Sequence, residues 1–75
     1  LAKKPSGYEE AEKMYRKCLK INPNYWKAMN NLGNLLAKKT SGYEEAEQLF
    51  QRSLEIQPKN EDVLKLLEIL KSLKK

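Results

Sequence analysis

The chain has 75 residues, of which 40% are hydrophobic and 33% are charged. A chain of this length forms at most one small domain and buries only about 60% of the surface that it exposes when unfolded. No stretch approaches the roughly 20 consecutive apolar residues that cross a bilayer. Because Cys18 is the single cysteine and there is no histidine, an internal disulfide framework and a Cys/His zinc site are also excluded.

The charge is unevenly distributed along the chain. Fifteen basic and ten acidic side chains give a formal net charge of +5, and nine of the basic residues but only three acidic ones fall within residues 1–40. Between residues 9 and 20 the acids come first and the bases last, which is the order that the helix macrodipole favours. We therefore interpret the basic excess as a solvated helix surface, with an anion-binding patch as the alternative.

The first residues, Leu-Ala-Lys-Lys-Pro, contain neither a methionine nor an apolar signal segment. We expect the sequence to be a piece of a longer protein. Residues 1–24 and 36–59 are identical at 14 of 24 positions without a gap, so the chain repeats itself with a period of 35 residues. Residues 1–4 repeat residues 36–39 and are therefore expected to end a preceding helix.

A first helix is predicted over residues 7–22. Ser6 and Glu9 have the spacing of a capping box, which marks a helix start, and Pro23 cannot continue a helix. Apolar residues at helical spacing would form its packing face: Ala11, Met14, Tyr15, Cys18, Leu19 and Ile21. Cys18 corresponds to Ser53 one repeat later, so we interpret it as a small helix-packing residue.

Residues 25–58 form the next predicted unit, a pair of helices. Asn24 is a suitable cap for a helix over about residues 25–39, and Ser41 and Glu44 repeat the capping box for the following helix, which Pro58 ends. The second helix repeats the apolar face of the first, with Ala46, Leu49, Phe50, Leu54 and Ile56.

A terminal or capping helix is predicted within residues 60–75, at about 61–74, with Asn60 as its cap. One apolar stripe suits the core: Val63, Leu64, Leu67 and Leu70. A second stripe consists of Leu66, Ile69 and Leu73. This second stripe either widens the core contact or docks another copy of the chain, a further repeat or a partner helix.

The order of these residues resembles the tetratricopeptide repeat family. Met29-x2-Leu32-Gly33-x2-Leu36, then Ala46-x3-Phe50, then Pro58, follow the family pattern W-x2-L-G-x2-Y, A-x3-F, P. The sequence departs from this pattern at Met29 and Leu36, and its period of 35 is also that of the RNA-reading pentatricopeptide repeats. Gly33 costs about 1 kcal/mol relative to alanine within a helix, so we expect a neighbouring helix to approach it closely.

The resemblance implies an all-α fold, a right-handed α-solenoid fragment of about four helices in antiparallel pairs. It also implies that the first helix of the pair lines a groove for an extended peptide or a partner helix. The groove residues would be Lys27, Asn30, Asn31, Asn34 and Lys38. Asn31 also matches one element of the carboxylate clamp of some family members, but Asp62 and Leu66 stand where that clamp has basic residues, so no clamp is expected.

The function predicted is therefore a protein-interaction scaffold that binds a protein or peptide. No enzymatic activity, metal or cofactor is expected, because two repeats do not enclose a pocket that would shift the pKa values of paired glutamates. Nucleic acid and membrane are not the expected partners, and a homo-oligomer through the terminal helix is an open alternative. An RNA-binding repeat segment and an oligomerisation or targeting appendage of an enzyme are the other functions considered.

Overall fold

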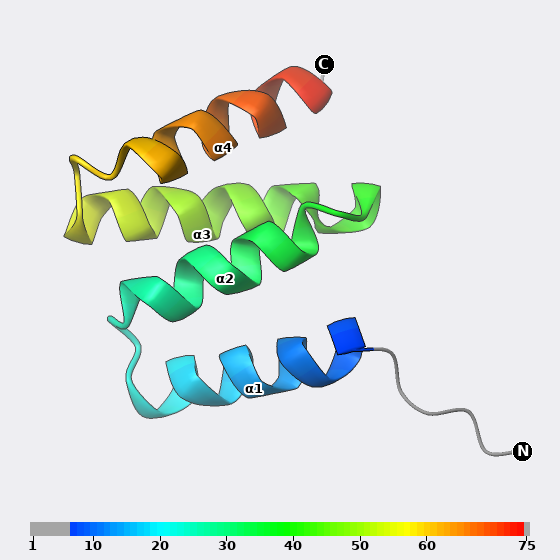
Figure 1. The fold of residues 1–75 in the computed structure, drawn as a ribbon, viewed down its shortest axis with the longest axis vertical. Helices are drawn as coiled ribbons and strands as arrows, with labels where there is room; N and C mark the ends of the chain where they lie inside the picture. The colour runs from blue at the N-terminus through cyan, green and yellow to red at the C-terminus, as the bar shows by residue number, and fades with distance from the viewer. Residues whose placement is uncertain (1–6, 75) are drawn as a thin grey trace, which may run out of the picture.

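The computed structural model describes residues 7–74, which form four α-helices and one short 3₁₀ helix. The helices are α1 (Gly7–Ile21), α2 (Trp26–Leu36), α3 (Tyr43–Ile56) and α4 (Glu61–Leu73), and the 3₁₀ helix η1 spans Thr40–Gly42. They stack in chain order and alternate in direction (Figure 1). The prediction of an all-α fold with four helices is confirmed for the residues that the structure describes.

The core is centred on α3, which lies between α2 and α4 (Figure 1). Its buried side chains fall into two clusters. Ala46 and Phe50 of α3 pack with Val63, Leu67 and Leu70 of α4, whereas Leu49 of α3 packs with Met29 and Leu32 of α2. Fully burying a valine, leucine, methionine or phenylalanine side chain stabilises the fold by about 1.5–3 kcal/mol. The two faces of α3 therefore hold its neighbouring helices together.

Gly33 allows α2 and α3 to approach closely, as the sequence predicts. A Cβ atom on Gly33 would lie only 2.7 Å from Cε1 of Phe50, whose side chain is 0% exposed. The ring of Phe50 occupies the space that a side chain at position 33 would need. The burial of this ring offsets the low helix propensity of glycine, which costs about 1 kcal/mol.

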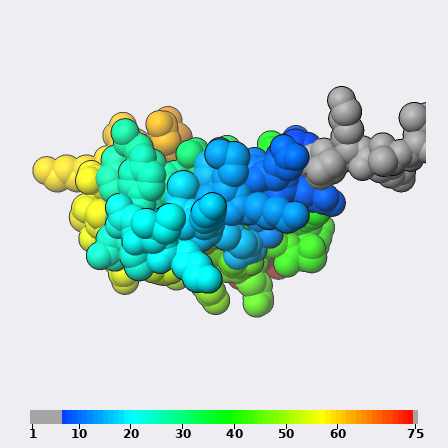
Figure 2. Space-filling view, turned by 90° about the horizontal axis from the view of Figure 1, so that it is seen from below, coloured from blue at the N-terminus to red at the C-terminus, as the bar shows by residue number. Residues whose placement is uncertain are grey.

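The helix α1 is less buried than its repeat counterpart α3. It has no buried residue, and Met14 and Ile21 are 65% and 77% exposed, although Leu49, the counterpart of Met14, is 6% exposed. Tyr15 and Leu19 pack against the cluster on α2, but the opposite side of α1 faces outward (Figure 2). The predicted packing roles of Met14, Ile21 and Cys18 are therefore wrong: Cys18 is exposed, whereas Ser53 is buried.

Of the predicted caps, Asn60 is confirmed. Its side-chain oxygen accepts a hydrogen bond from the backbone N–H of Val63 at 3.4 Å, at the start of α4. The prediction for Asn24 is wrong, because α2 begins one residue later than expected and its cap residue is Tyr25, which makes no side-chain capping bond. Ser6, in the first predicted capping box, lies outside the described residues.

The turn between α2 and α3 corrects two further predictions. α2 ends at Leu36 instead of residue 39, because Lys39 is extended (φ −122°, ψ 137°) and η1 follows at once. Ser41 lies in η1 and does not cap α3, whose cap residue is Gly42. A Cβ atom on Gly42 would lie 2.4 Å from the carbonyl oxygen of Leu36. The chain therefore folds back onto the end of α2 so tightly that α2 cannot continue.

The prolines and the first stripe of α4 mostly match the predictions. α1 and α3 end two residues before Pro23 and Pro58, respectively. Val63, Leu67 and Leu70 are buried as expected, but Leu64 is 43% exposed, so its assignment to the core is wrong. Leu64 lies on a side of α4 that no described helix covers.

Replacing Gly33 with alanine tests the contact with Phe50. Gly33→Ala should lower the melting temperature, because an overpacked core costs about 1–3 kcal/mol, which exceeds the gain of about 1 kcal/mol in helix propensity. Gly7→Ala is the matched control, since a Cβ atom there meets nothing within 4 Å. Thermal unfolding followed by circular dichroism measures both. In a Phe50→Leu background the penalty of Gly33→Ala should shrink; equal penalties in both backgrounds would contradict the contact.

Candidate binding surface

Three polar residues project from α2 and the turn after it, on the side away from the core. Asn31 and Asn34 are exposed on α2, and Lys38 follows one turn after Asn34. Residues three and four apart share one face of a helix, whereas the buried residues of α2 (Ala28, Met29, Leu32 and Gly33) take the opposite face. We call Asn31, Asn34 and Lys38 the α2 ridge.

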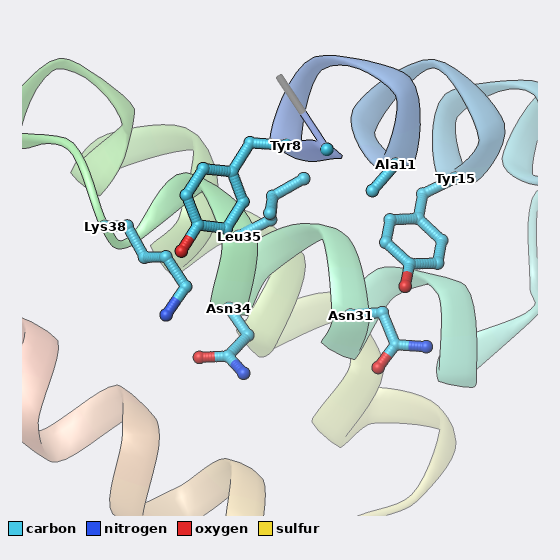
Figure 3. Close-up of a pocket in the computed structure, with 8 residues that line it drawn as sticks. Tyr8, Ala11, Tyr15, Asn31, Asn34, Leu35 and Lys38 are labelled. Carbon is cyan, nitrogen blue, oxygen red and sulfur yellow. The ribbon is translucent and has the colours of Figure 1, made fainter. Parts of the chain in front are cut away.

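A cavity of about 500 Å³ lies between α1 and the α2 ridge. Figure 3 shows the rings of Tyr8 and Tyr15 on one side of it, with their hydroxyl groups directed toward α2. The Nζ atom of Lys38 lies 5.9 Å from the centroid of the Tyr8 ring. The residues that line this cavity are Gly7, Tyr8, Ala11, Tyr15, Asn31, Asn34, Leu35 and Lys38. The cavity is thus apolar and aromatic on one side and polar on the other.

A second, smaller hollow of about 200 Å³ lies between the α2 ridge and α4. Its residues are Asn34, Ala37, Lys38, Phe50, Leu66, Ile69, Leu70 and Leu73. We call it the α2–α4 groove. Ile69 and Leu73 are 57% and 55% exposed and form its outer apolar wall, whereas Phe50 and Leu70 belong to the core beneath. Asn34 and Lys38 border both this groove and the cavity beside α1.

The structure brings together three of the five predicted groove residues, namely the members of the α2 ridge. Lys27 and Asn30 line neither hollow. Lys27 is exposed, with its Nζ atom 5.7 Å from the centroid of the Trp26 ring. Asn30 is half-buried, and its side-chain oxygen is buried without a hydrogen-bond partner among the described residues.

The second stripe of α4 and the predicted groove belong to one surface. Leu66, Ile69 and Leu73 line the α2–α4 groove together with Asn34 and Lys38. Leu66 is half-buried against the core, and the other two are exposed. No pattern in the sequence predicts this connection, or the place of Tyr8 and Tyr15 in the lining of the cavity beside α1. Only the packing of α1 against α2 and of α4 against α3 brings these residues together, and no spacing in the sequence predicts that packing.

Lys38 is the single charged residue among the described residues that line the two hollows. Two acidic residues, Glu9 and Glu12, lie around a separate hollow beyond Tyr8, which Lys38 and Lys39 also border. Within residues 7–74, no group of three or more His, Cys, Asp or Glu side chains could hold a metal ion, and no helix is long and apolar enough to cross a membrane.

The surface charges also tie α1 to α3. Arg16 of α1 donates hydrogen bonds to Glu45 of α3 at 2.8 and 3.1 Å, and to Glu12 one turn earlier at 2.9 Å. The guanidinium of Arg16 lowers the pKa of the Glu45 carboxyl below its ordinary value. A further ion pair, Lys74 with Glu47, joins the end of α4 to α3.

The pair of Arg16 and Glu45 predicts a dependence of stability on pH. Because the pKa of Glu45 is lower in the folded chain, the stabilisation is complete above the unfolded pKa of about 4.5 and is lost as the pH falls through the folded value. Arg16→Gln should lower the free energy of unfolding by about 0.5 kcal/mol at pH 7, since both side chains are largely solvated. Urea unfolding at pH 7 and at pH 3 measures this effect. The difference in the free energy of unfolding between the native chain and Arg16→Gln should be smaller at pH 3.

Lys17→Gln removes the same charge from the same helix and is the control for this measurement. It should leave stability nearly unchanged at both pH values, because Lys17 is exposed. An equal loss of stability in Arg16→Gln and Lys17→Gln would show that net charge, not the link to Glu45, is responsible.

Part of the chain matches a known protein family. Residues 14–48, which run from the middle of α1 through α2 and η1 into α3, match the tetratricopeptide repeat family. No curated protein and no solved structure matches the chain. The matched segment contains the whole α2 ridge and the Gly33 position that contacts Phe50.

Proposed function

The chain carries a tetratricopeptide repeat over residues 14–48, and from this we propose that it is a non-catalytic interaction module that binds a peptide or a partner helix across the α2 ridge. Tetratricopeptide repeats typically bind proteins and generally act as scaffolds without catalysis. The observation that carries the proposal is the convergence of the α2 ridge with a hollow on each of its sides.

The chemistry of the ridge suits the main chain of a peptide. Each asparagine amide offers two N–H donors and one accepting oxygen, so it can pair with both the C=O and the N–H groups of an extended segment. Asn31 and Asn34 are exposed. The cavity beside α1, at about 500 Å³, falls within the range of 300–1,000 Å³ that is common for ligand sites. The arrangement supports main-chain recognition by the amides and side-chain recognition by the hollows.

We also propose how the repeats divide the chain. α2 and α3 form the complete unit over residues 25–58, α1 is the closing helix of a partial unit over residues 7–22, and α4 within residues 60–75 is a terminal helix. The identity of residues 1–24 with 36–59 at 14 positions supports this division, as does the similar length of α1 and α3. Residues 1–4, expected to end a preceding helix, lie outside the described residues.

The α2–α4 groove also bears on the alternative of self-association through Leu66, Ile69 and Leu73. These residues share their groove with Asn34 and Lys38, so a ligand that uses the ridge would cover them as well. We therefore propose that a bound peptide or helix, not a second copy of the chain, occupies this stripe. Sedimentation of the unliganded chain over a range of concentrations should show a monomer.

Asn31→Ala should weaken peptide binding without loss of stability. A phage-displayed library of random 12-residue peptides is selected against the 75-residue chain, and the strongest binder is synthesised with a fluorescent label. Loss of a hydrogen bond costs about 0.5–1.5 kcal/mol, so fluorescence anisotropy should show a roughly two- to tenfold higher Kd. The melting temperature should stay the same, because Asn31 is exposed.

Asn24→Ala is the matched control for this substitution. Asn24 is an exposed asparagine before α2 that lines neither hollow and does not cap the helix. Its replacement should leave the Kd unchanged. Equal affinity of the native chain and Asn31→Ala for the selected peptide, or unfolding of Asn31→Ala, would overturn the assignment of the ridge.

A further inference from the structure

We propose that the ligand of this surface is an acidic and apolar peptide segment, in which a carboxylate side chain that pairs with Lys38 stands between two apolar side chains, one for each hollow. This inference rests on the proposed function and adds the chemistry of the partner. Its three parts come from the apolar walls, the position of Lys38, and the position of Asn34.

The first part concerns the α2–α4 groove. Ile69 and Leu73 are more than half exposed although the core residues Phe50 and Leu70 lie directly beneath them. A ligand side chain in the groove would remove from water the apolar surface of Ile69 and Leu73 on α4 and of Ala37 after α2. Since burial of apolar surface is the main source of affinity at such sites, the groove selects an apolar side chain.

The cavity beside α1 also selects an apolar side chain. Its α1 wall consists of Tyr8, Ala11 and Tyr15, and Leu35 of α2 also lines it. Tyrosine rings contribute large apolar surfaces with a polar hydroxyl at one end. In Figure 3 these hydroxyl groups lie at the side of the cavity nearest to the ridge. An apolar or aromatic side chain therefore fits between the rings, with the hydroxyl groups left to bind the main chain.

The charge comes from Lys38, which borders both hollows and is the one charged residue among their described lining residues. A carboxylate placed there would meet an ammonium group and no carboxylate of the lining. Hydrogen bonds between such charged groups are about twice as strong as those between neutral groups. A basic ligand would be repelled by Lys38, and a polyanion such as RNA would find a single cation where several phosphates need neutralising.

Asn34 and Lys38 fix the order of the three ligand groups. Both residues border both hollows, so a chain that enters both hollows must cross α2 at these two residues. The crossing segment then lies beside Lys38, with its main chain in reach of the Asn34 amide. The order along the ligand is therefore apolar, acidic, apolar.

The test uses four pools of labelled 12-residue peptides with Gly/Ser flanks and a fixed central triplet: Leu-Glu-Leu, Leu-Gln-Leu, Leu-Lys-Leu or Ser-Glu-Ser. Fluorescence anisotropy with the 75-residue chain measures each Kd. The Leu-Glu-Leu pool should bind most tightly, about fivefold better than Leu-Gln-Leu and more than tenfold better than the other two. Equal binding of the Leu-Glu-Leu and Leu-Gln-Leu pools would overturn the proposal.

Charge reversal at Lys38 supplies the second arm. Lys38→Glu should reverse the preference of the chain, so that the Leu-Lys-Leu pool binds more tightly than the Leu-Glu-Leu pool. Lys39→Glu is the matched control: it changes the net charge equally, but Lys39 lines neither hollow, so the preference for glutamate should survive. Loss of the preference in both variants would assign it to net charge and overturn the role of Lys38. Circular dichroism confirms that each variant is folded.

A third pair of variants tests the apolar wall. Ile69→Gln should weaken Leu-Glu-Leu binding severalfold, whereas Leu64→Gln should not, because Leu64 is a similarly exposed residue of α4 that lies outside the groove. If Asn31→Ala weakens binding but the pools show no charge preference, the proposed function holds and this inference fails. If no pool or selected peptide depends on Asn31, the proposed function itself fails.

Discussion

The contact between Gly33 and the Phe50 ring is the constraint on which the rest of the structure depends. The ring is fully buried, and a Cβ atom at position 33 would stand 2.7 Å from it. The same ring belongs to the buried cluster that includes Val63, Leu67 and Leu70 of α4, so it lies between Gly33 of α2 and the core that α3 forms with α4. It also lies beneath the α2–α4 groove. The spacing of α2 and α4, and with it the width of the groove, therefore depends on this one side chain.

The two copies of the repeated segment show how strongly neighbours determine burial. Residues 8–21 of α1 and 43–56 of α3 are identical at 7 of 14 positions, and Met14 is 65% exposed whereas its apolar counterpart Leu49 is 6% exposed. α3 is covered on two sides, by α2 and α4, whereas α1 packs against α2 on one side (Figure 1). In a repeat protein each unit is stabilised by its contacts with the next. The apolar positions of α1 are thus those of a helix with two neighbours, of which the described residues supply one.

Features that depend on local sequence could be predicted, and those that depend on packing could not. The period of 35, the helix ends before Pro23 and Pro58, and the Asn60 cap follow from residue chemistry alone. The early end of α2 could not be predicted, because it results from the close approach of Gly42 to the Leu36 carbonyl. Ser41 and Glu44 have the spacing of a capping box, but the same turn places Ser41 in η1, so Ser41 does not cap α3.

The residues of the candidate site also fall into two groups, those that the sequence predicts and those that only the packing of the helices brings together. The ridge residues Asn31, Asn34 and Lys38 follow from the family pattern, because their positions are fixed relative to Gly33 on α2 and the turn directly after it. The tyrosines of α1 and the leucines of α4 join the ridge only because α1 packs against α2 and α4 packs against α3. The separate docking surface predicted on α4 is for this reason part of the surface that the ridge defines.

Binding across the α2 ridge is tested most directly by chemical-shift mapping of the isotope-labelled chain with the Leu-Glu-Leu peptide. The largest shifts should fall on the side-chain amides of Asn31 and Asn34 and on the methyl groups of Leu66 and Ile69. Asn31 lines the cavity beside α1, Leu66 and Ile69 line the α2–α4 groove, and Asn34 borders both. Shifts centred instead on Met14 and Ile21, on the outward side of α1, would contradict binding at the ridge and place the ligand on the uncovered face of that helix.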